Sequence, residues 1–246
     1  MKKILLCLML SSPCLAGTIT TTSTGLMTVT FSSGTVGAVG GGTTYTYTQK
    51  TDAAAGTYTV NMVLGTNVTV HSLIVVGCQI LTANNTMTVT DNNTNSYTAV
   101  TGATYVNQNG GGSNRIGLWY TLNANAGATT VTCADSGHTA TAVQGTAVEY
   151  TTASGGTYDT GNYNSPVSAG SPSGAATTTT VTNEFVVDYA SNMGGTVTSQ
   201  SGTLRSNYVN QFYSGEEDTT VATPQSYSGT FTAASGGYVM VQAAFK

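Results

Sequence analysis

Acidic side chains are the first group in this sequence whose type and spacing could do chemistry, because glycoside hydrolases work with a pair of carboxylates. Glu184 and Asp188 would share one face of an extended strand, but four residues at about 3.3 Å each place them about 13 Å apart. The reaction needs carboxyl groups roughly 5 to 9.5 Å apart. Glu216 and Asp218 would lie about 7 Å apart if extended, yet the residues before them indicate a turn. We therefore expect the cluster at 216–218 to be a solvated guard of a sheet edge.

Oxygen-bearing side chains also follow one another from Asp91, in the run Asp-Asn-Asn-Thr-Asn, and Ca²⁺ prefers such hard ligands. An EF-hand loop counted from Asp91 would need Gly in the sixth place and Glu in the twelfth, but Ser96 and Gly102 stand there. The run is better explained as the turn of a hairpin between strands at 86–90 and 96–100. The candidate ligands of a structural calcium ion, which would be the only cofactor, are Asp91, Glu216, Glu217 and Asp218.

Two cysteines, Cys78 and Cys133, lie within alternating segments. In residues 73–80 the polar Gln79 should face solvent, which turns Cys78 inward, and in residues 129–134 the outward threonines turn Cys133 inward. In an oxidising compartment the two thiols could form a disulfide between sheets, enclosing about 55 residues and contributing about 4 kcal/mol. The alternative is two buried thiols that act as small hydrophobic side chains. Neither cysteine has the CxxC or Cys/His spacing of a redox or metal site.

The two histidines, His71 and His138, give little support to a catalytic triad. A Ser-His-Asp or Cys-His arrangement would have to use one of them, and no GxSxG nucleophile motif is present. We interpret both as surface or turn residues and predict that the protein is not an enzyme.

Aromatic side chains offer the best indication of binding. Within residues 116–122, Trp119 alternates with the apolar positions and should point to the opposite side of the strand, beside small residues. An outward indole is the kind of platform on which sugars stack. The candidate glycan-binding residues are thus Trp119, Tyr45 and Tyr47. The alternative is that residues 151–180 or the N-terminal segment cover the indole.

These side chains must be positioned by β-strands. Only 7% of the residues are charged, while 39% are hydrophobic and 14 are Tyr, which argues against both a helical bundle and a disordered chain. Apolar residues alternate with Thr, Ser or Asn in short runs separated by Gly, Asn and Ser clusters, the pattern of half-buried strands. We predict an all-β, two-sheet antiparallel sandwich. The main runs are 27–31, 57–64, 73–80, 86–90, 116–122, 129–134, 147–150, 181–189, 226–231 and 238–245.

Residues 1–16 have the layout of a secretory signal peptide, with Lys2 and Lys3 before an apolar run at 4–10 and a small residue, Ala16, at the expected cleavage point. The apolar run is too short to span a bilayer, which takes about 20 residues. We expect a secreted or cell-surface protein without a membrane span.

Export would also remove Cys7 and Cys14, and the residues before Cys14 do not form the lipobox of a lipid anchor. Without Lys2 and Lys3, four basic residues remain against ten acidic ones, a charge of −6. An acidic, lysine-poor surface repels phosphate backbones, so nucleic acid is not an expected partner.

The segment Thr18–Phe31 is rich in β-branched residues and contains neither charge nor proline. Such a strand near a chain end pairs readily with a sheet edge. Pairing within its own sandwich would add one more strand, whereas pairing with a neighbouring copy would produce a fibre.

Several longer segments follow one another in a familiar order of strands and turns. They are SLIVVGCQI, TMTVTDNNTNSYTAV, RIGLWYTLNANAGATTVTCA, TAVEYT, TNEFVVDYA, the acidic EED at 216–218, and YSGTFTAASGGYVMVQAAFK. From about Thr57 to the C-terminus the chain thus resembles a jelly-roll or Ig-like β-sandwich module of secreted and surface proteins of environmental bacteria. The resemblance implies a Greek-key sandwich and carries over no catalytic residue.

The expected organisation is a signal peptide at 1–16, an N-terminal β-rich extension at 17–56, and a sandwich domain at 57–246 with a flexible excursion at 151–180. The expected function is that of an exported, non-catalytic structural or adhesive protein. The alternatives are a carbohydrate-binding module that uses exposed aromatic residues, with glycans or other cell-surface components as partners, and a fibre subunit that self-associates through its N-terminal strand.

Overall fold

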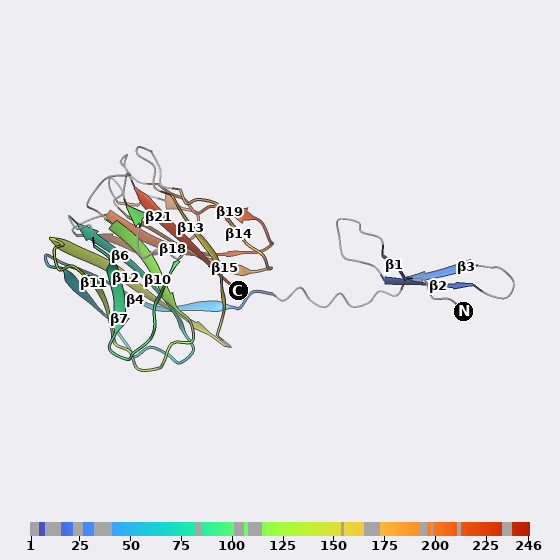
Figure 1. Ribbon diagram of the computed structural model, residues 1–246, viewed down its shortest axis with the longest axis horizontal. Coiled ribbons are helices and arrows are strands. Elements are labelled where there is room, and N and C mark those ends of the chain that lie inside the picture. Colours follow the sequence, from blue (N-terminus) through green and yellow to red (C-terminus); the bar gives the residue numbers. More distant parts are fainter. Residues whose placement is uncertain are drawn as a thin grey trace. The chain divides into compact units, whose positions relative to one another are not determined.

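A computed structural model of the chain describes residues 41–81, 85–100, 115–153, 155–164, 173–191, 196–197, 199–210, 213–232 and 238–246, together with the backbone of strands at 5–7, 16–21, 27–31 and 106–107. The chain divides into two compact units, residues 1–40 and 41–246. In the first unit, β1 (Leu5–Cys7), β2 (Ala16–Thr21) and β3 (Met27–Phe31) form an antiparallel sheet in the order β1-β2-β3 (Figure 1).

The second unit is built on three larger antiparallel sheets. The central sheet has the order β4-β12-β6-β10-β8, and β9 also pairs with β10. Its strands are β4 (Tyr45–Ala55), β6 (Leu73–Leu81), β8 (Thr98–Ala99), β9 (Val106–Asn107), β10 (Arg115–Thr121) and β12 (Ala142–Thr152).

The small sheet has the order β5-β11-β7, and the C-terminal sheet has the order β13-β21-β15-β18-β17. The small sheet consists of β5 (Thr59–Val63), β7 (Met87–Asp91) and β11 (Thr130–Asp135). The C-terminal sheet consists of β13 (Tyr158–Asn164), β15 (Glu184–Ser191), β17 (Thr203–Val209), β18 (Tyr213–Val221) and β21 (Val239–Phe245).

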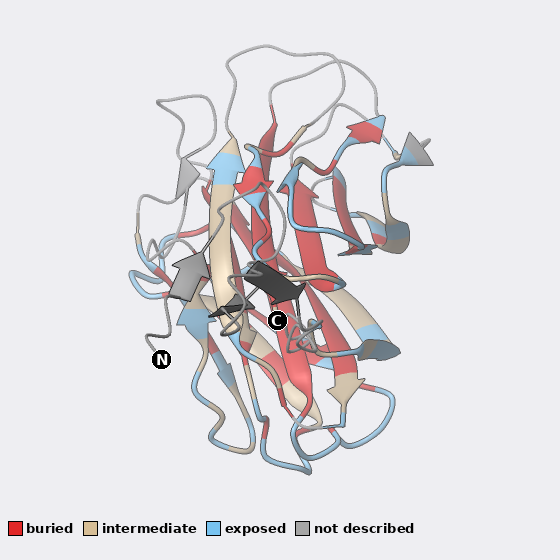
Figure 2. Ribbon diagram, turned by 90° about the vertical axis from the view of Figure 1, so that its right-hand side faces the viewer, coloured by how far each residue is buried: buried red, intermediate tan, exposed pale blue. Residues whose placement is uncertain are grey.

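The central sheet is buried on both faces because it lies between the other two. Alternate residues of β6 divide between two cores: Ile74, Val76 and Cys78 pack with residues of the small sheet, whereas Leu73 and Val75 pack with residues of the C-terminal sheet. Buried residues accordingly run the length of the central strands in Figure 2. The predicted all-β antiparallel sandwich is confirmed, with a third sheet added to the two that were expected.

Short strands complete the fold against the outer face of the C-terminal sheet. Phe231 of β20 packs with Ala190 and Met240, and Tyr227 of β19 packs with Val186. These strands form two pairs, β14 (Thr177–Thr178) with β19 (Ser226–Tyr227), and β16 (Ser199–Gln200) with β20 (Phe231–Thr232). The part of the chain that the structure describes contains no candidate membrane-spanning helix.

Several sequence expectations about organisation need correction. The segments at 86–90 and 96–100 do not form a hairpin, because β7 pairs with β11 in the small sheet and β8 pairs with β10 in the central sheet. The predicted extension at 17–56 ends too late, since β4 is an edge strand of the central sheet. Within the excursion predicted at 151–180, β13 is a strand of the C-terminal sheet, while residues 165–172 lie outside the described part.

Candidate functional site

Cys78 of β6 and Cys133 of β11 are joined by a disulfide that connects the central and small sheets. Both residues are buried. Gly145 on the neighbouring strand β12 provides the space, since an added Cβ would lie 3.0 Å from Cys133 Sγ and 2.8 Å from Met62 Sδ. Of the two alternatives that the sequence left open, the structure therefore has the inter-sheet crosslink rather than two free thiols.

Trp119 does not form an exposed platform, so the alternative of a covered indole holds. Its side chain is 3% exposed and belongs to the core between the central and small sheets, together with Ile74 and Val76. Alternation along β10 did send the indole to the face opposite Leu118. That face is covered as well, by the small sheet and by residues such as Ala128.

The other two aromatic candidates lie on the opposite face of the central sheet from Trp119. Tyr45 stacks on Phe185 at 4.8 Å between ring centroids, and burial raises the pKa of its hydroxyl. Tyr47 is 37% exposed, and the guanidinium carbon of Arg205 lies 4.3 Å from the centroid of its ring. The three residues therefore do not converge on one binding surface.

Asp91 is occupied by the turn that follows β7. Its carboxylate accepts hydrogen bonds from the backbone of Asn93 (2.9 Å) and Asn95 (3.1 Å), from the Asn95 amide (2.6 Å) and from the Tyr97 hydroxyl (3.1 Å). Burial and the adjacent carboxylate raise the pKa of Tyr97. Asp91 belongs to the small sheet and the acidic residues at 216–218 to the C-terminal sheet, so the structure does not bring the proposed calcium ligands together. Within the described part of the chain, no group of three or more His, Cys, Asp or Glu could hold a metal ion.

The acidic cluster at 216–218 is not a solvated guard, which is a second correction. All three residues are buried, because β18 is an inner strand between β15 and β17. Alternation also splits the cluster. Glu217 pairs with the outward-facing Asp188, so Glu216 and Asp218 point toward the central sheet and Glu217 points away from it.

A partly buried inter-sheet polar cluster is the main site that the sequence did not predict. We use this name for Lys50, Asp52, Thr146, Arg205, Ser206, Glu216 and Asp218, which come from β4, β12, β17 and β18. Asp52 pairs with Lys50 and accepts hydrogen bonds from Thr146 (2.8 Å) and Ser206 (2.6 Å). Arg205 binds both carboxylate oxygens of Asp218 through Nε and, at 3.1 Å, through Nη2. The cluster therefore joins the central and C-terminal sheets at one side.

Glu216 differs from its neighbours in this cluster. It is fully buried, and neither carboxyl oxygen has a hydrogen-bond partner among the described residues. Burial, followed by repulsion from Asp52 and Asp218, raises its pKa well above the ordinary value. Burial and the two neighbouring carboxylates thus favour the neutral, protonated form of Glu216.

A second polar network lies on the outer face of the C-terminal sheet. Glu217 accepts hydrogen bonds from the Ser201 hydroxyl (2.7 Å) and the Gly202 amide (2.9 Å), and Asp188 accepts one from the Gln242 amide (2.8 Å). Burial and the charge of Glu217 raise the pKa of Asp188 well above its usual range. The network lies on the face of the sheet that the short strands cover, and its hydrogen bonds connect their loops to the sheet.

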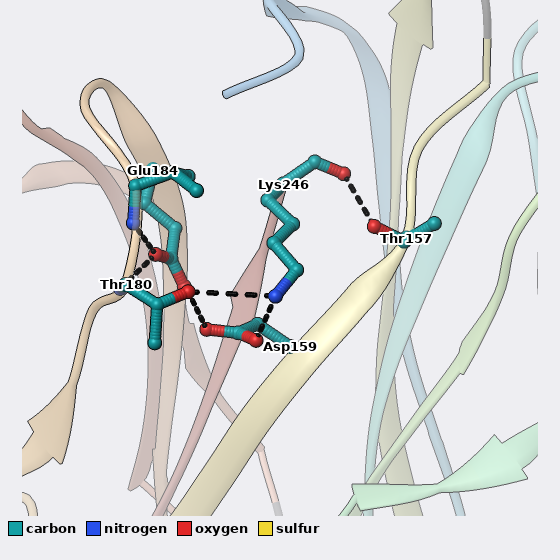
Figure 3. A network of polar contacts seen from close by, with 6 residues as sticks. Thr157, Asp159, Thr180, Glu184 and Lys246 are labelled. Carbon is teal, nitrogen blue, oxygen red and sulfur yellow. Dashed lines mark hydrogen bonds and ion pairs between the residues drawn. The ribbon is translucent and has the colours of Figure 1, made fainter. Parts of the chain in front are cut away.

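A third network anchors the C-terminal residue, Lys246, as Figure 3 shows. Lys246 forms an ion pair with Asp159 of β13, and its backbone exchanges hydrogen bonds with Thr157. The Thr180 hydroxyl donates to Asp159 at 2.8 Å, and the Thr180 amide donates to Glu184 at 2.6 Å. Burial alone would raise the pKa of Asp159, but the hydrogen bonds from Lys246 and Thr180 hold it below its usual value.

All ten carboxylates of the chain lie within the described residues, and none of them is exposed. Each belongs to a network inside the fold or to a tight turn. His138 stacks on Tyr58 at 4.3 Å between centroids, and His71 has a positive φ of 65° in a turn. The described residues therefore present no exposed acid and no histidine paired with a nucleophile.

No family model matches the chain, and neither a curated protein nor a solved structure matches it.

One signal in the sequence could have indicated the inter-sheet polar cluster. Lys50 and Asp52 lie two residues apart inside a long strand, and so do Glu216 and Asp218. Charged residues at alternate positions in the middle of a strand share one face. Which face they share could not be judged without the second sheet.

Proposed function

We propose that the protein is exported and works outside the cell as a non-catalytic structural or adhesive β-sandwich. The signal-like residues 1–16 and the disulfide between Cys78 and Cys133 support export, because disulfides persist in oxidising compartments.

The placement of charge is the observation that carries the proposal. Acids and bases that serve the fold are not available to bind or transform a substrate. The outer face of the small sheet presents neutral side chains in rows across its strands, because the register places Thr59 and Thr88 beside Ala134, and Asn61 and Thr90 beside Thr132. Such a surface makes contacts through hydroxyl, amide and methyl groups.

Adhesion that does not rely on charge should resist salt. We would measure retention of the exported protein on hydroxyl-terminated, carboxylate-terminated and amine-terminated surfaces, at low ionic strength and at about 1 M salt, where the Debye length is about 3 Å. The proposal predicts retention on the hydroxyl surface that salt leaves unchanged. Retention on a charged surface alone, abolished by salt, would contradict it, and so would hydrolysis of a polysaccharide by the purified protein.

A further inference from the structure

The sheet edges of the second unit differ in how well they are protected against pairing with another chain. Unprotected edges invite strand addition, and proteins block them with charges, irregular register or very short strands. In the two larger sheets, β8 and β9 have only two residues each. The other three edge strands, β4, β13 and β17, each contain a charged residue and an irregular register with their neighbour. Those charged residues are Lys50 and Asp52 in β4, Asp159 in β13 and Arg205 in β17.

The edge strand β5 of the small sheet has neither protection. It contains no charged residue, and its register with β11 is continuous over five residues. The opposite edge strand, β7, ends in Asp91. Two of the largest exposed apolar side chains of the described residues lie at β5, namely Val63 (64% exposed) and Tyr58 just before it (43% exposed).

The backbone of β5 is oriented so that it can accept another strand. Leu64 N donates to Thr129 O, and Asp135 N donates to Tyr58 O, which fixes the hydrogen-bonded pairs of the ladder. Because these pairs alternate in an antiparallel sheet, the N–H and C=O groups of the residues between them point away from β11. Those residues are Thr59, Asn61 and Val63.

The first unit contains a strand that would lose its partner on export. β2 pairs with β1 through Ala16, Gly17 and Thr18, and all of β1 lies within the residues expected to be removed. The remaining hairpin of β2 and β3 has two strands, and an isolated two-stranded hairpin is at best marginally stable in water. Residues 17–31 contain no charge and no proline, and the five residues of β2 that remain equal β5 in length.

We propose that, in the exported chain, β2 of one copy adds to β5 of a second copy and extends its small sheet. This inference rests on the export that the proposed function includes. The occupant is β2 because it loses β1 on export, carries no charge and matches β5 in length. Addition to β5 of the same chain would leave a monomer, and that outcome would contradict the proposal. Donor and acceptor are different surfaces of the chain, so the contact is heterologous and generates open linear assemblies.

The test uses the full chain, secreted by its own N-terminal segment, with the new N-terminus read by mass spectrometry. Sedimentation velocity and electron microscopy should show concentration-dependent linear assemblies for this protein and monomers for a variant that lacks residues 17–31. A fluorescent peptide of residues 17–31 should bind that deletion variant. Recovery of a chain that retains residues 1–16, or a single monodisperse species for both proteins, would overturn the proposal.

Edge variants locate the contact. Val63→Lys places a charge on β5, and Asn61→Pro removes an N–H that points away from β11, so both should weaken peptide binding at least tenfold. Thr90→Lys is the matched control, because it adds the same charge to an exposed position of the opposite edge strand, β7. Equal loss with Thr90→Lys, or no loss with Val63→Lys, would refute the assignment to β5. An intact disulfide and an unchanged unfolding midpoint show that each variant is folded, and retention on the hydroxyl surface tests the proposed function separately.

Discussion

The buried Glu216 makes stability fall as pH rises, and Glu216→Gln should remove this dependence. In the folded protein, burial and neighbouring carboxylates raise the pKa of this carboxyl well above its ordinary value, which favours the neutral form. In the unfolded chain it ionises near its ordinary pKa of about 4.3. The folded state therefore holds a proton that the unfolded state has lost, and stability is complete below about pH 4.3 and declines toward the folded pKa.

The slope of this decline is about 1.4 kcal/mol per pH unit for one group. Gln has the shape of the protonated acid and cannot ionise. The free energy of unfolding of Glu216→Gln should therefore equal that of the wild type at low pH, and should exceed it by a further 1.4 kcal/mol or so for each pH unit above about 4.3. The gain ends where the pH reaches the folded pKa.

Urea unfolding gives the free energy of unfolding of both proteins from pH 4 to about 9, and the change of that free energy with pH is compared between them. The signal is the fluorescence of Trp119, which is the only Trp and is buried. The control is Asp218→Asn on the same face of β18, which should destabilise the protein at neutral pH because Arg205 loses its ion-pair partner. A difference between Glu216→Gln and wild type that does not change with pH would refute the assignment of a neutral carboxyl.

Three further variants examine the core. Replacing Cys78 and Cys133 together by Ala should lower the free energy of unfolding by about 4 kcal/mol in the loop-entropy account. In urea titrations, a reducing agent should lower the free energy of unfolding of the wild type but not that of this variant. Gly77→Ala should cost about 1 to 3 kcal/mol, since the new Cβ would lie 2.5 Å from the Tyr189 ring; an unchanged thermal midpoint would show that the sheets can separate there. Trp119→Ala should lower the free energy of unfolding by about 3 to 5 kcal/mol, measured by calorimetry. A variant that lost glycan binding but kept its stability would contradict the buried position of the indole.

The alternation of residue types predicted strands such as β6, β10, β11, β15 and β21, and the side of the strand on which each residue lies, but it missed β4, β13, β17 and β18. Cys78 and Cys133 do point into one core, and Trp119 does point away from Leu118. These inferences hold because a strand has a period of two, so neighbouring residues must lie on opposite faces whatever the rest of the chain does. The same reasoning places Glu216 and Asp218 together and Glu217 apart.

Whether a face meets solvent was decided by the tertiary structure. Gln79 points away from Cys78, as expected, but it is buried rather than exposed, because the C-terminal sheet covers that face. Glu216 was misjudged for the same reason, and the sequence left open whether Trp119 was covered. Burial of a strand face depends on a second sheet whose residues lie far away in the sequence, and the alternation within one strand carries no information about that partner.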